Sequence, residues 1–266
     1  MSSALDRLSA LRAVFCAIGL ALTASCSADS SPTVVGRSAD PGPGTAGPAP
    51  AGERVLFVGN SLTYGNDLPL LVEALSQAGG RPLSVDSVTY GGVSLEDHWG
   101  LKTQDRIAAG GWRYVVLQQG PSALLESRVN LREWTARFDT VIKQAGARTA
   151  MYMVWPESYR REAFPDVSAS YRLAAEDVGG VLLPVGDAWL AAWRRNPALP
   201  LYGSDGFHPT LTASYLAALT IYAGLTGGSP VGLPTRLRLR SGESVEVDAR
   251  FGPALQASAE EVVARQ

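Results

Sequence analysis

Residues 54–65 read Arg-Val-Leu-Phe-Val-Gly-Asn-Ser-Leu-Thr-Tyr-Gly, an apolar run that ends in small polar residues. The apolar part, Arg54 to Val58, has the length and the β-branched and aromatic content of a buried strand. Gly59 and Asn60 then favour a tight turn. Ser61 is therefore expected on a turn directly after the first strand of the domain.

Short apolar runs continue to alternate with helical segments along the chain. Further strands are predicted over Leu83–Val88, Tyr114–Leu117, Thr149–Val154 and Val181–Val185, and helices over Leu68–Gln77, Leu131–Ala145 and Thr210–Leu225. Strands that alternate with helices pair in parallel through right-handed crossovers. The predicted fold class is α/β, a three-layer α/β/α sandwich with a mainly parallel five-stranded sheet. The alternating tail from Thr235 to Arg250 predicts a surface hairpin.

Three loops follow predicted strands and are expected to meet at one edge of the sheet, where ligands bind in such folds. They are Gly59 to Gly65, Tyr90 to Leu95 and Gln118 to Ser122. A serine in the first loop attacks an ester only beside a base, because the pKa of a free hydroxyl is far too high. The alternative for Ser61 is a helix N-cap or turn residue. The Gly-x-Ser-x-Gly elbow of α/β-hydrolases is missing from this loop.

A base is offered by the stretch Ser204-Asp-Gly-Phe-His-Pro-Thr210, directly before a predicted helix. The tight turn at Gly206 allows Asp205 to reach one imidazole nitrogen of His208 while the other nitrogen faces a hydroxyl. An aspartate that caps a turn beside a buried histidine is the alternative. The other histidine of the chain, His98, lies in a helical segment beside Trp99, and we expect it to pack or contact substrate.

Gly-Asn-Ser61-Leu near the start of the domain and Asp205-x-x-His208 near its end resemble the SGNH (GDSL-like) hydrolase superfamily. The resemblance extends from Arg54 to about Leu225 and implies a flavodoxin-like sandwich. It also implies that Ser61 is the nucleophile and that Asp205 and His208 complete a catalytic triad. Asn60 stands where the family's first block has aspartate.

This sequence departs further from the family's pattern at the two middle blocks. The resemblance implies an oxyanion hole that includes the backbone N–H groups of Ser61 and Gly92, although an alternative alignment places Leu95 at the family's glycine. The third block lacks its asparagine, so Gln118 or Gln119 is expected to supply the side-chain donor. Gln119-Gly-x-Ser122 is similar to a stretch of SGNH carbohydrate acetylesterases. Trp155, Glu157 and Tyr159, after the fourth strand, are expected to line the cleft or to pack near it.

Composition limits the other classes of function. The chain of 266 residues has 23 basic and 25 acidic residues and no basic run in the folded part, so nucleic acid is not an expected partner. Hydrophobic residues make up 46% of it, enough for a sizeable core. Both cysteines, Cys16 and Cys26, precede the predicted domain, and a histidine-rich zinc centre is implausible with two histidines. No metal or cofactor is expected.

The N-terminus resembles a targeting segment. Arg7 and Arg12 precede the apolar run Ala13 to Leu22, and small residues lead into Cys26. Residues 1–26 are predicted to be a signal peptide, because the apolar run is shorter than the ~20 residues that cross a bilayer. Two forms of signal peptide remain open. One is a lipoprotein type that is cleaved before a lipidated Cys26, and the other is an ordinary signal peptide. Residues 27–52 predict a disordered Pro/Gly-rich linker and residues 53–266 the hydrolase domain.

The expected protein is an exported serine esterase, secreted or lipid-anchored at the cell surface through Cys26. It is expected to hydrolyse carboxylic esters through an acyl-enzyme on Ser61. The glutamine in the third block points to acetyl esters on carbohydrates, with other small esters still open. The alternatives are an acyltransferase that uses the same triad and a non-catalytic glycan-binding lipoprotein on the same scaffold.

Overall fold

The computed structural model describes residues 52–266. The predicted signal peptide, lipid attachment at Cys26 and nearly all of the linker lie outside the described residues and stay predictions. Within residues 52–266, no helix is both long and apolar enough to cross a membrane.

Five parallel strands form the main sheet, in the order β2-β1-β3-β4-β5. They are β1 (Glu53–Gly59), β2 (Leu83–Thr89), β3 (Tyr114–Leu117), β4 (Arg148–Tyr152) and β5 (Val181–Leu183). The predicted α/β/α sandwich with a parallel five-stranded sheet is confirmed. The chain passes from β1 to β2 at one side of β1, and then crosses to β3 at the other side. The direction of the strand order therefore switches beside β1. Ligands of open α/β sheets bind at such a switch point.

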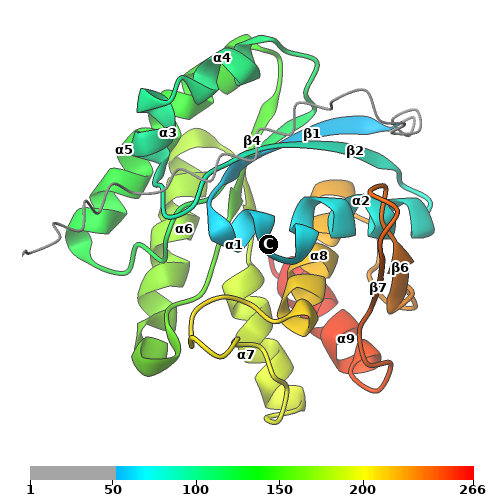
Figure 1. Ribbon diagram of the computed structural model, residues 1–266. Helices are drawn as coiled ribbons and strands as arrows, with labels where there is room; N and C mark the ends of the chain where they lie inside the picture. Colours follow the sequence, from blue (N-terminus) through cyan, green and yellow to red (C-terminus); the bar gives the residue numbers. More distant parts are fainter. Residues whose placement is uncertain (1–51) are drawn as a thin grey trace, which may run out of the picture. The chain divides into compact units, whose positions relative to one another are not determined.

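Helices cover both faces of the sheet (Figure 1). One group packs together on one face, α2 (Leu68–Ala78), α7 (Val185–Arg195), α8 (Leu211–Thr226) and α9 (Gly252–Val263). The other group is α3 (Leu95–Gly100), α4 (Thr103–Ala108), α5 (Leu125–Gln144) and α6 (Phe164–Val178). Short segments complete the described chain: α1 (Ser61–Tyr64), the 3-10 turns η1 (Gly65–Asp67) and η2 (Ser158–Ala163), and a small antiparallel pair, β6 (Arg236–Arg238) and β7 (Ser244–Glu246).

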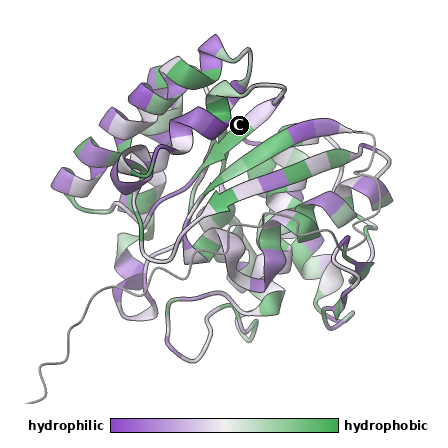
Figure 2. Cartoon of the chain, turned by 45° about the horizontal axis from the view of Figure 1, so that its top comes forward, coloured by the Kyte–Doolittle hydropathy of each residue, from purple (hydrophilic) through white to green (hydrophobic). Residues whose placement is uncertain are grey.

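The core lies between the sheet and the helices. Figure 2 shows hydrophobic residues along the strands and mixed colours around the helices that cover them. Helix α8 is the exception, since most of its residues are buried, and it packs against α2, α7, α9 and β5. It begins at a cap in which Thr210 Oγ1 accepts a hydrogen bond from Ala213 N–H, at 3.2 Å. This buried helix begins three residues after His208, so it anchors the loop that carries the predicted base.

The predicted hairpin of the tail is confirmed in β6 and β7, and an ion pair to a buried carboxylate anchors the segment between them. Arg240 Nε donates to Glu73 Oε1 of α2 at 2.9 Å, and Glu73 is only 1% exposed. The second carboxylate oxygen of Glu73 accepts a hydrogen bond from Val85 N–H of β2. Both oxygens of this buried carboxylate are therefore paired, as a buried charge requires.

Candidate active site

The nucleophile turn begins where β1 ends. Asn60 caps α1, and its Oδ1 accepts a hydrogen bond from Leu62 N–H at 3.1 Å. Ser61 is the first residue of that helix. Gly59 allows the turn to form, because a Cβ atom there would lie 2.4 Å from Gln118 Oε1 and 2.4 Å from Thr63 Oγ1. The position predicted for Ser61, on a tight turn after the first strand, is confirmed.

Ser61, His208 and Asp205 form a continuous hydrogen-bonded chain although 147 residues separate the serine from the histidine. His208 Nε2 lies 2.9 Å from Ser61 Oγ, and His208 Nδ1 lies 2.5 Å from Asp205 Oδ2. The other oxygen of Asp205 accepts hydrogen bonds from the backbone N–H groups of Phe207 and His208, each at 3.0 Å. The three residues predicted to act together are thus brought together.

The charge of Asp205 decides which nitrogen of His208 can take a proton. The hydrogen bond from His208, followed by that from Phe207 N–H, lowers the pKa of Asp205 to about 2. The ionised carboxylate can only accept hydrogen bonds, so His208 Nδ1 must carry its proton. Nε2 of the neutral ring is then left as an acceptor for the Ser61 hydroxyl. This is the tautomer that a general base for Ser61 needs.

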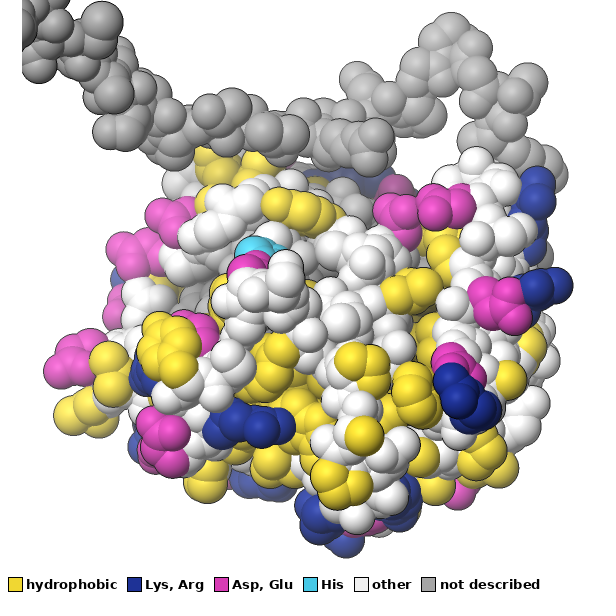
Figure 3. All heavy atoms as spheres, turned by 60° about the horizontal axis from the view of Figure 1, so that its bottom comes forward, with side chains coloured by type: hydrophobic (Ala, Val, Ile, Leu, Met, Phe, Trp, Pro, Cys, Tyr) yellow, Lys and Arg dark blue, Asp and Glu magenta, His cyan; other side chains and the backbone are white. Residues whose placement is uncertain are grey.

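The His208–Asp205 pair is open to solvent. The side chains of His208 and Asp205 are 47% and 50% exposed. Figure 3 shows the histidine colour, cyan, at the surface with an acidic side chain against it, and hydrophobic side chains gathered elsewhere on the same face. Water can therefore reach this pair directly.

The loop that carries His208 is held from the side of β4. Trp155 Nε1 donates to Phe207 O at 2.9 Å, and Ser158 N–H donates to Gly206 O at 2.8 Å. Gly206 has φ of 71°, and a Cβ atom there would lie 2.4 Å from Ser158 Oγ, so any larger residue would be strained. Trp155 is fully buried and positions this loop, whereas Tyr159 is 78% exposed nearby in the chain.

Gln118 is fully buried beneath the nucleophile turn. Its Oε1 accepts from Asn60 N–H (2.9 Å) and Thr63 Oγ1 (2.7 Å), and its Nε2 donates to Asn60 Oδ1 (3.0 Å) and Gln119 O (2.6 Å). The opposite orientation of this amide would place its oxygen against two acceptors. Three of its four hydrogen bonds hold the turn that presents Ser61.

Gln119 is also engaged within the protein. Its Oε1 accepts from Leu95 N–H at 3.1 Å, and its Nε2 donates to Ser122 Oγ at 3.0 Å and to Asn130 Oδ1 at 3.5 Å. Neither glutamine therefore has an amide N–H left for a substrate in this arrangement. In this structure both amides brace adjacent loops, and a glutamine donor to the oxyanion stays a prediction.

Backbone donors remain for an oxyanion. The N–H groups of Ser61 and Gly92 have no acceptor within the part of the chain that the structure describes. Leu95, the alternative to Gly92, donates its N–H to Gln119 and begins α3. The loop around Gly92 is tied to the nucleophile turn, since Asn60 Nδ2 donates to Val93 O at 3.0 Å.

Solved structures with the same arrangement of strands and helices include one from Slackia heliotrinireducens described as a candidate SGNH hydrolase. It is 27% identical, covers 65% of this chain and 99% of its own, and superposes with a TM-score of 0.54. The fold is that of the SGNH hydrolases. The resemblance inferred from the sequence blocks is confirmed, and the open edge of this SGNH sheet is where Ser61 and His208 meet.

Two further solved structures have the same fold. A DUF4886 family protein from Bacteroides uniformis is 21% identical, covers 80% of this chain and 95% of its own, and has a TM-score of 0.65. Axe2, an acetylxylan esterase from Geobacillus stearothermophilus, is 16% identical, covers 65% of this chain and 94% of its own, and has a TM-score of 0.52. Models of protein families give no match to this sequence, and neither do curated protein sequences.

His98, the other histidine of the domain, is buried, and neither of its ring nitrogens bonds a carboxylate among the described residues. Its Nδ1 lies 2.9 Å from Thr103 Oγ1, and its Nε2 lies 2.9 Å from Gly59 O. Burial lowers the pKa of His98, only partly offset by the hydrogen bond to Gly59. The neutral ring donates from Nε2 to the carbonyl, so it braces the end of β1, in agreement with the predicted packing role.

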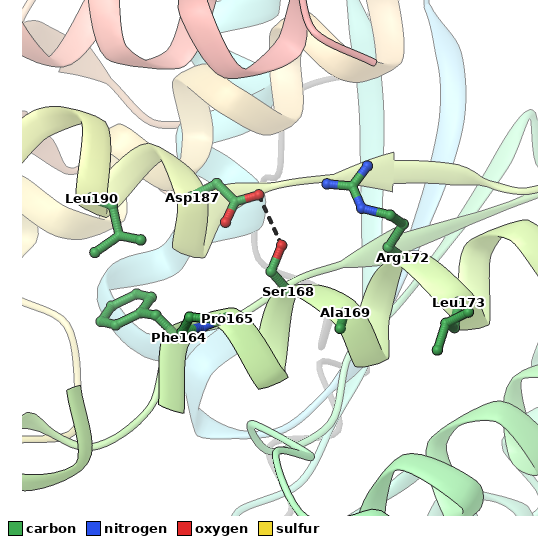
Figure 4. Close-up of a pocket in the computed structure, with 8 residues that line it drawn as sticks. All are labelled: Phe164, Pro165, Ser168, Ala169, Arg172, Leu173, Asp187 and Leu190. Carbon is green, nitrogen blue, oxygen red and sulfur yellow. Dashed lines mark hydrogen bonds between the residues drawn. The ribbon is translucent and has the colours of Figure 1, made fainter. Parts of the chain in front are cut away.

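A hollow of about 560 Å³ lies between α6 and α7, away from Ser61 (Figure 4). Ser168 Oγ donates to Asp187 Oδ2 at 3.1 Å there, and burial raises the pKa of Asp187. Its walls are mostly apolar, and it contains no member of the Ser61 chain. Within residues 52–266, no group of three or more histidine, cysteine, aspartate or glutamate side chains is arranged to hold a metal ion.

Proposed function

We propose that this protein is a serine hydrolase that cleaves carboxylic esters. The observation that carries the proposal is the chain Asp205–His208–Ser61, with a donor–acceptor distance of 2.9 Å at the serine. An ionised Asp205 fixes the tautomer in which His208 Nε2 accepts the hydroxyl proton. The SGNH fold of the domain supports hydrolase chemistry at this edge of the sheet.

The reaction proceeds in two acyl transfers. Ser61 Oγ bonds to the ester carbonyl carbon while His208 Nε2 takes its proton, and the tetrahedral intermediate then expels the alcohol, which receives that proton. Water next attacks the acyl-enzyme with His208 again as base, and the acid and free Ser61 are released. The N–H groups of Ser61 and Gly92 stabilise the oxyanion, each such donor typically contributing about 3 kcal/mol to lowering the barrier.

An acetyl ester on a carbohydrate is the substrate class that fits best. The third block, Gln119-Gly-x-Ser122, is similar to that of SGNH carbohydrate acetylesterases, and the fold neighbour Axe2 is an acetylxylan esterase. Tyr64, three residues after Ser61, is 47% exposed, and Tyr159 is 78% exposed. Exposed tyrosine rings offer an apolar face with a polar tip, which suits the faces and hydroxyls of a sugar ring.

Hydrolysis fits the site better than transfer to a second alcohol. An acyltransferase must keep water from the acyl-enzyme, whereas the His208 side chain is 47% exposed. A non-catalytic glycan-binding role would leave the complete Ser61–His208–Asp205 geometry without a purpose.

The substrate class is tested by turnover on a matched series of esters. We expect the purified protein to cleave p-nitrophenyl acetate faster than the butyrate and octanoate esters, and to release acetate from acetylated xylo-oligosaccharides. Release of acetate without detectable cleavage of the long-chain esters supports the proposed class. A preference for octanoate would reject acetyl specificity, and no cleavage of any ester would reject the hydrolase.

The sequence before Glu53 supports export of this hydrolase, with lipid attachment at Cys26 or free secretion. In a bacterial host we expect the mature protein to lack about its first 25 residues, because the Arg/apolar/small-residue start is typical of a cleaved signal peptide. Mass spectrometry of the fractionated protein measures this. An intact chain in the cytoplasm would contradict export. Release of the Cys26→Ala variant from membranes would select the lipoprotein form.

A further inference from the structure

Two loops that are far apart in sequence must keep a fixed separation for Ser61 to react. One loop carries Ser61 and continues through η1, and the other carries His208. Within the described residues, four successive carbonyl groups of the His208 loop accept hydrogen bonds, the first of them Gly206 O from Ser158 N–H. Trp155 Nε1 donates to Phe207 O, Gly203 N–H to His208 O, and Asn66 Nδ2 to Pro209 O at 3.0 Å.

Asn66 differs from the other donors because it belongs to the nucleophile loop. Its Nδ2 also donates to Ser214 Oγ of α8 at 2.9 Å, so both amide protons are used across the gap between the loops. Apart from the Ser61–His208 bond itself, these are the hydrogen bonds that join residues 59–67 to residues 203–214 within the part of the chain described.

The backbone of Asn66 is held in an unusual conformation to make these bonds. Its φ and ψ are 53° and 29°, and the next residue, Asp67, has φ of 52°. Left-handed conformations are uncommon for residues other than glycine, and asparagine and aspartate tolerate them best. Strained residues persist where surrounding contacts over-determine them, and they cluster at functional sites. Here the contacts that hold Asn66 lead directly to the residue after His208.

We propose that Asn66 is a positioning residue that sets the separation of His208 from Ser61, a role that rests on the proposed hydrolysis at Ser61. Trp155 and Gly203 also hold the histidine loop, but neither residue belongs to the nucleophile loop. Asn66 draws the Pro209 carbonyl toward the nucleophile loop and thereby fixes the half-exposed imidazole at hydrogen-bonding distance. A misplacement of about 1 Å at such a contact is enough to cost about 10²-fold in rate.

The test compares two substitutions at Asn66 with a matched control at Asp67. Asn66→Gly removes the amide and accepts the same φ, and Asn66→Asp keeps the shape but loses the donor. We expect each to lower kcat by ~10- to 100-fold with KM within about twofold of wild type, because positioning acts on the chemical step. Asp67→Asn, in the same conformation and without a side-chain cap bond, is expected to keep kcat within about twofold.

A readout that does not depend on turnover separates this role from the proposed function. The chain has two histidines, so the imidazole signals of His208 and His98 can be followed by NMR in the full-length protein. We expect Asn66→Gly to shift the His208 signals and leave those of His98 in place. Unchanged His208 signals would overturn the positioning role even if the protein had no esterase activity. Loss of kcat in strict proportion to loss of folded protein would also overturn it, since a merely structural role predicts that result.

Discussion

Replacing Ser61 by alanine is expected to lower kcat for ester hydrolysis by ~10⁴-fold or more, because the hydroxyl that forms the acyl-enzyme is lost. The midpoint of thermal unfolding should change little. Among residues 52–266 the Ser61 hydroxyl has one hydrogen-bond partner, His208, and the side chain is only partly buried, so its removal opens no cavity. Steady-state kinetics and a melting curve of the two proteins measure both expectations.

A fluorophosphonate that traps active serines gives an independent reading. It should add to Ser61 in the wild-type protein and fail to label the Ser61→Ala variant. Ser204→Ala is the matched control, since Ser204 is an exposed serine beside Asp205 with no hydrogen bond to its hydroxyl among the described residues. The assignment of the nucleophile is wrong if Ser61→Ala keeps more than about 1% of the turnover, or if the label is found on another serine.

The sheet could be predicted from the sequence because each of its strands is a short apolar run buried between two layers of helix. The third strand, Tyr114–Leu117, has the predicted bounds, and the others differ by one or two residues at their ends. Strand ends are less well marked than strand centres, since the last residues of a run can pair or turn equally well. Pro184 ends β5 two residues before its predicted end.

The helices were predicted less completely, for different physical reasons. Helix α5 begins at Leu125, six residues before the predicted start, because Ser127 Oγ bonds both the N–H and the carbonyl of Leu124 to form its first turn. Leu124 and Leu125 are exposed, so the apolar pattern does not mark this turn. Helix α6 was not predicted although its buried residues recur at helical spacing, Phe164, Val167, Tyr171, Ala174 and Val178.

The candidate site also contains parts that the sequence could suggest and parts that it could not. Asp205 and His208 are three residues apart, and their pairing is local, so the sequence alone could suggest it. The contact of Asn66 with Pro209 joins residues 143 apart, and no local pattern marks it. No local pattern marks the partners of Gln118 and Gln119 either, and their residue types suggested a donor to substrate. Only their burial and partners reveal that their amides are already engaged.

The two histidines of the chain should respond to alanine in opposite ways. His208→Ala is expected to lower kcat by ~10⁴-fold, since the base for both acyl transfers is lost. Its effect on stability should be small, because the His208 side chain is 47% exposed. His98→Ala should instead lower the free energy of unfolding by ~2–4 kcal/mol, since it leaves a cavity and removes the partners of Thr103 and the Gly59 carbonyl.

Urea unfolding and steady-state kinetics on both variants distinguish a catalytic base, expected at His208, from a structural residue, expected at His98. Folded His98→Ala protein should retain kcat within about tenfold of wild type, because Gln118 still holds the nucleophile turn from below. Asp205→Asn adds a third comparison, since it keeps the shape of the loop while no longer fixing the Nδ1–H tautomer of His208, and about 10⁴-fold of kcat should be lost. A full loss of turnover in folded His98→Ala with an active His208→Ala would reverse the assignment. His98 would then be the base, and the Asp205–His208 pair would be a cap on the loop before α8.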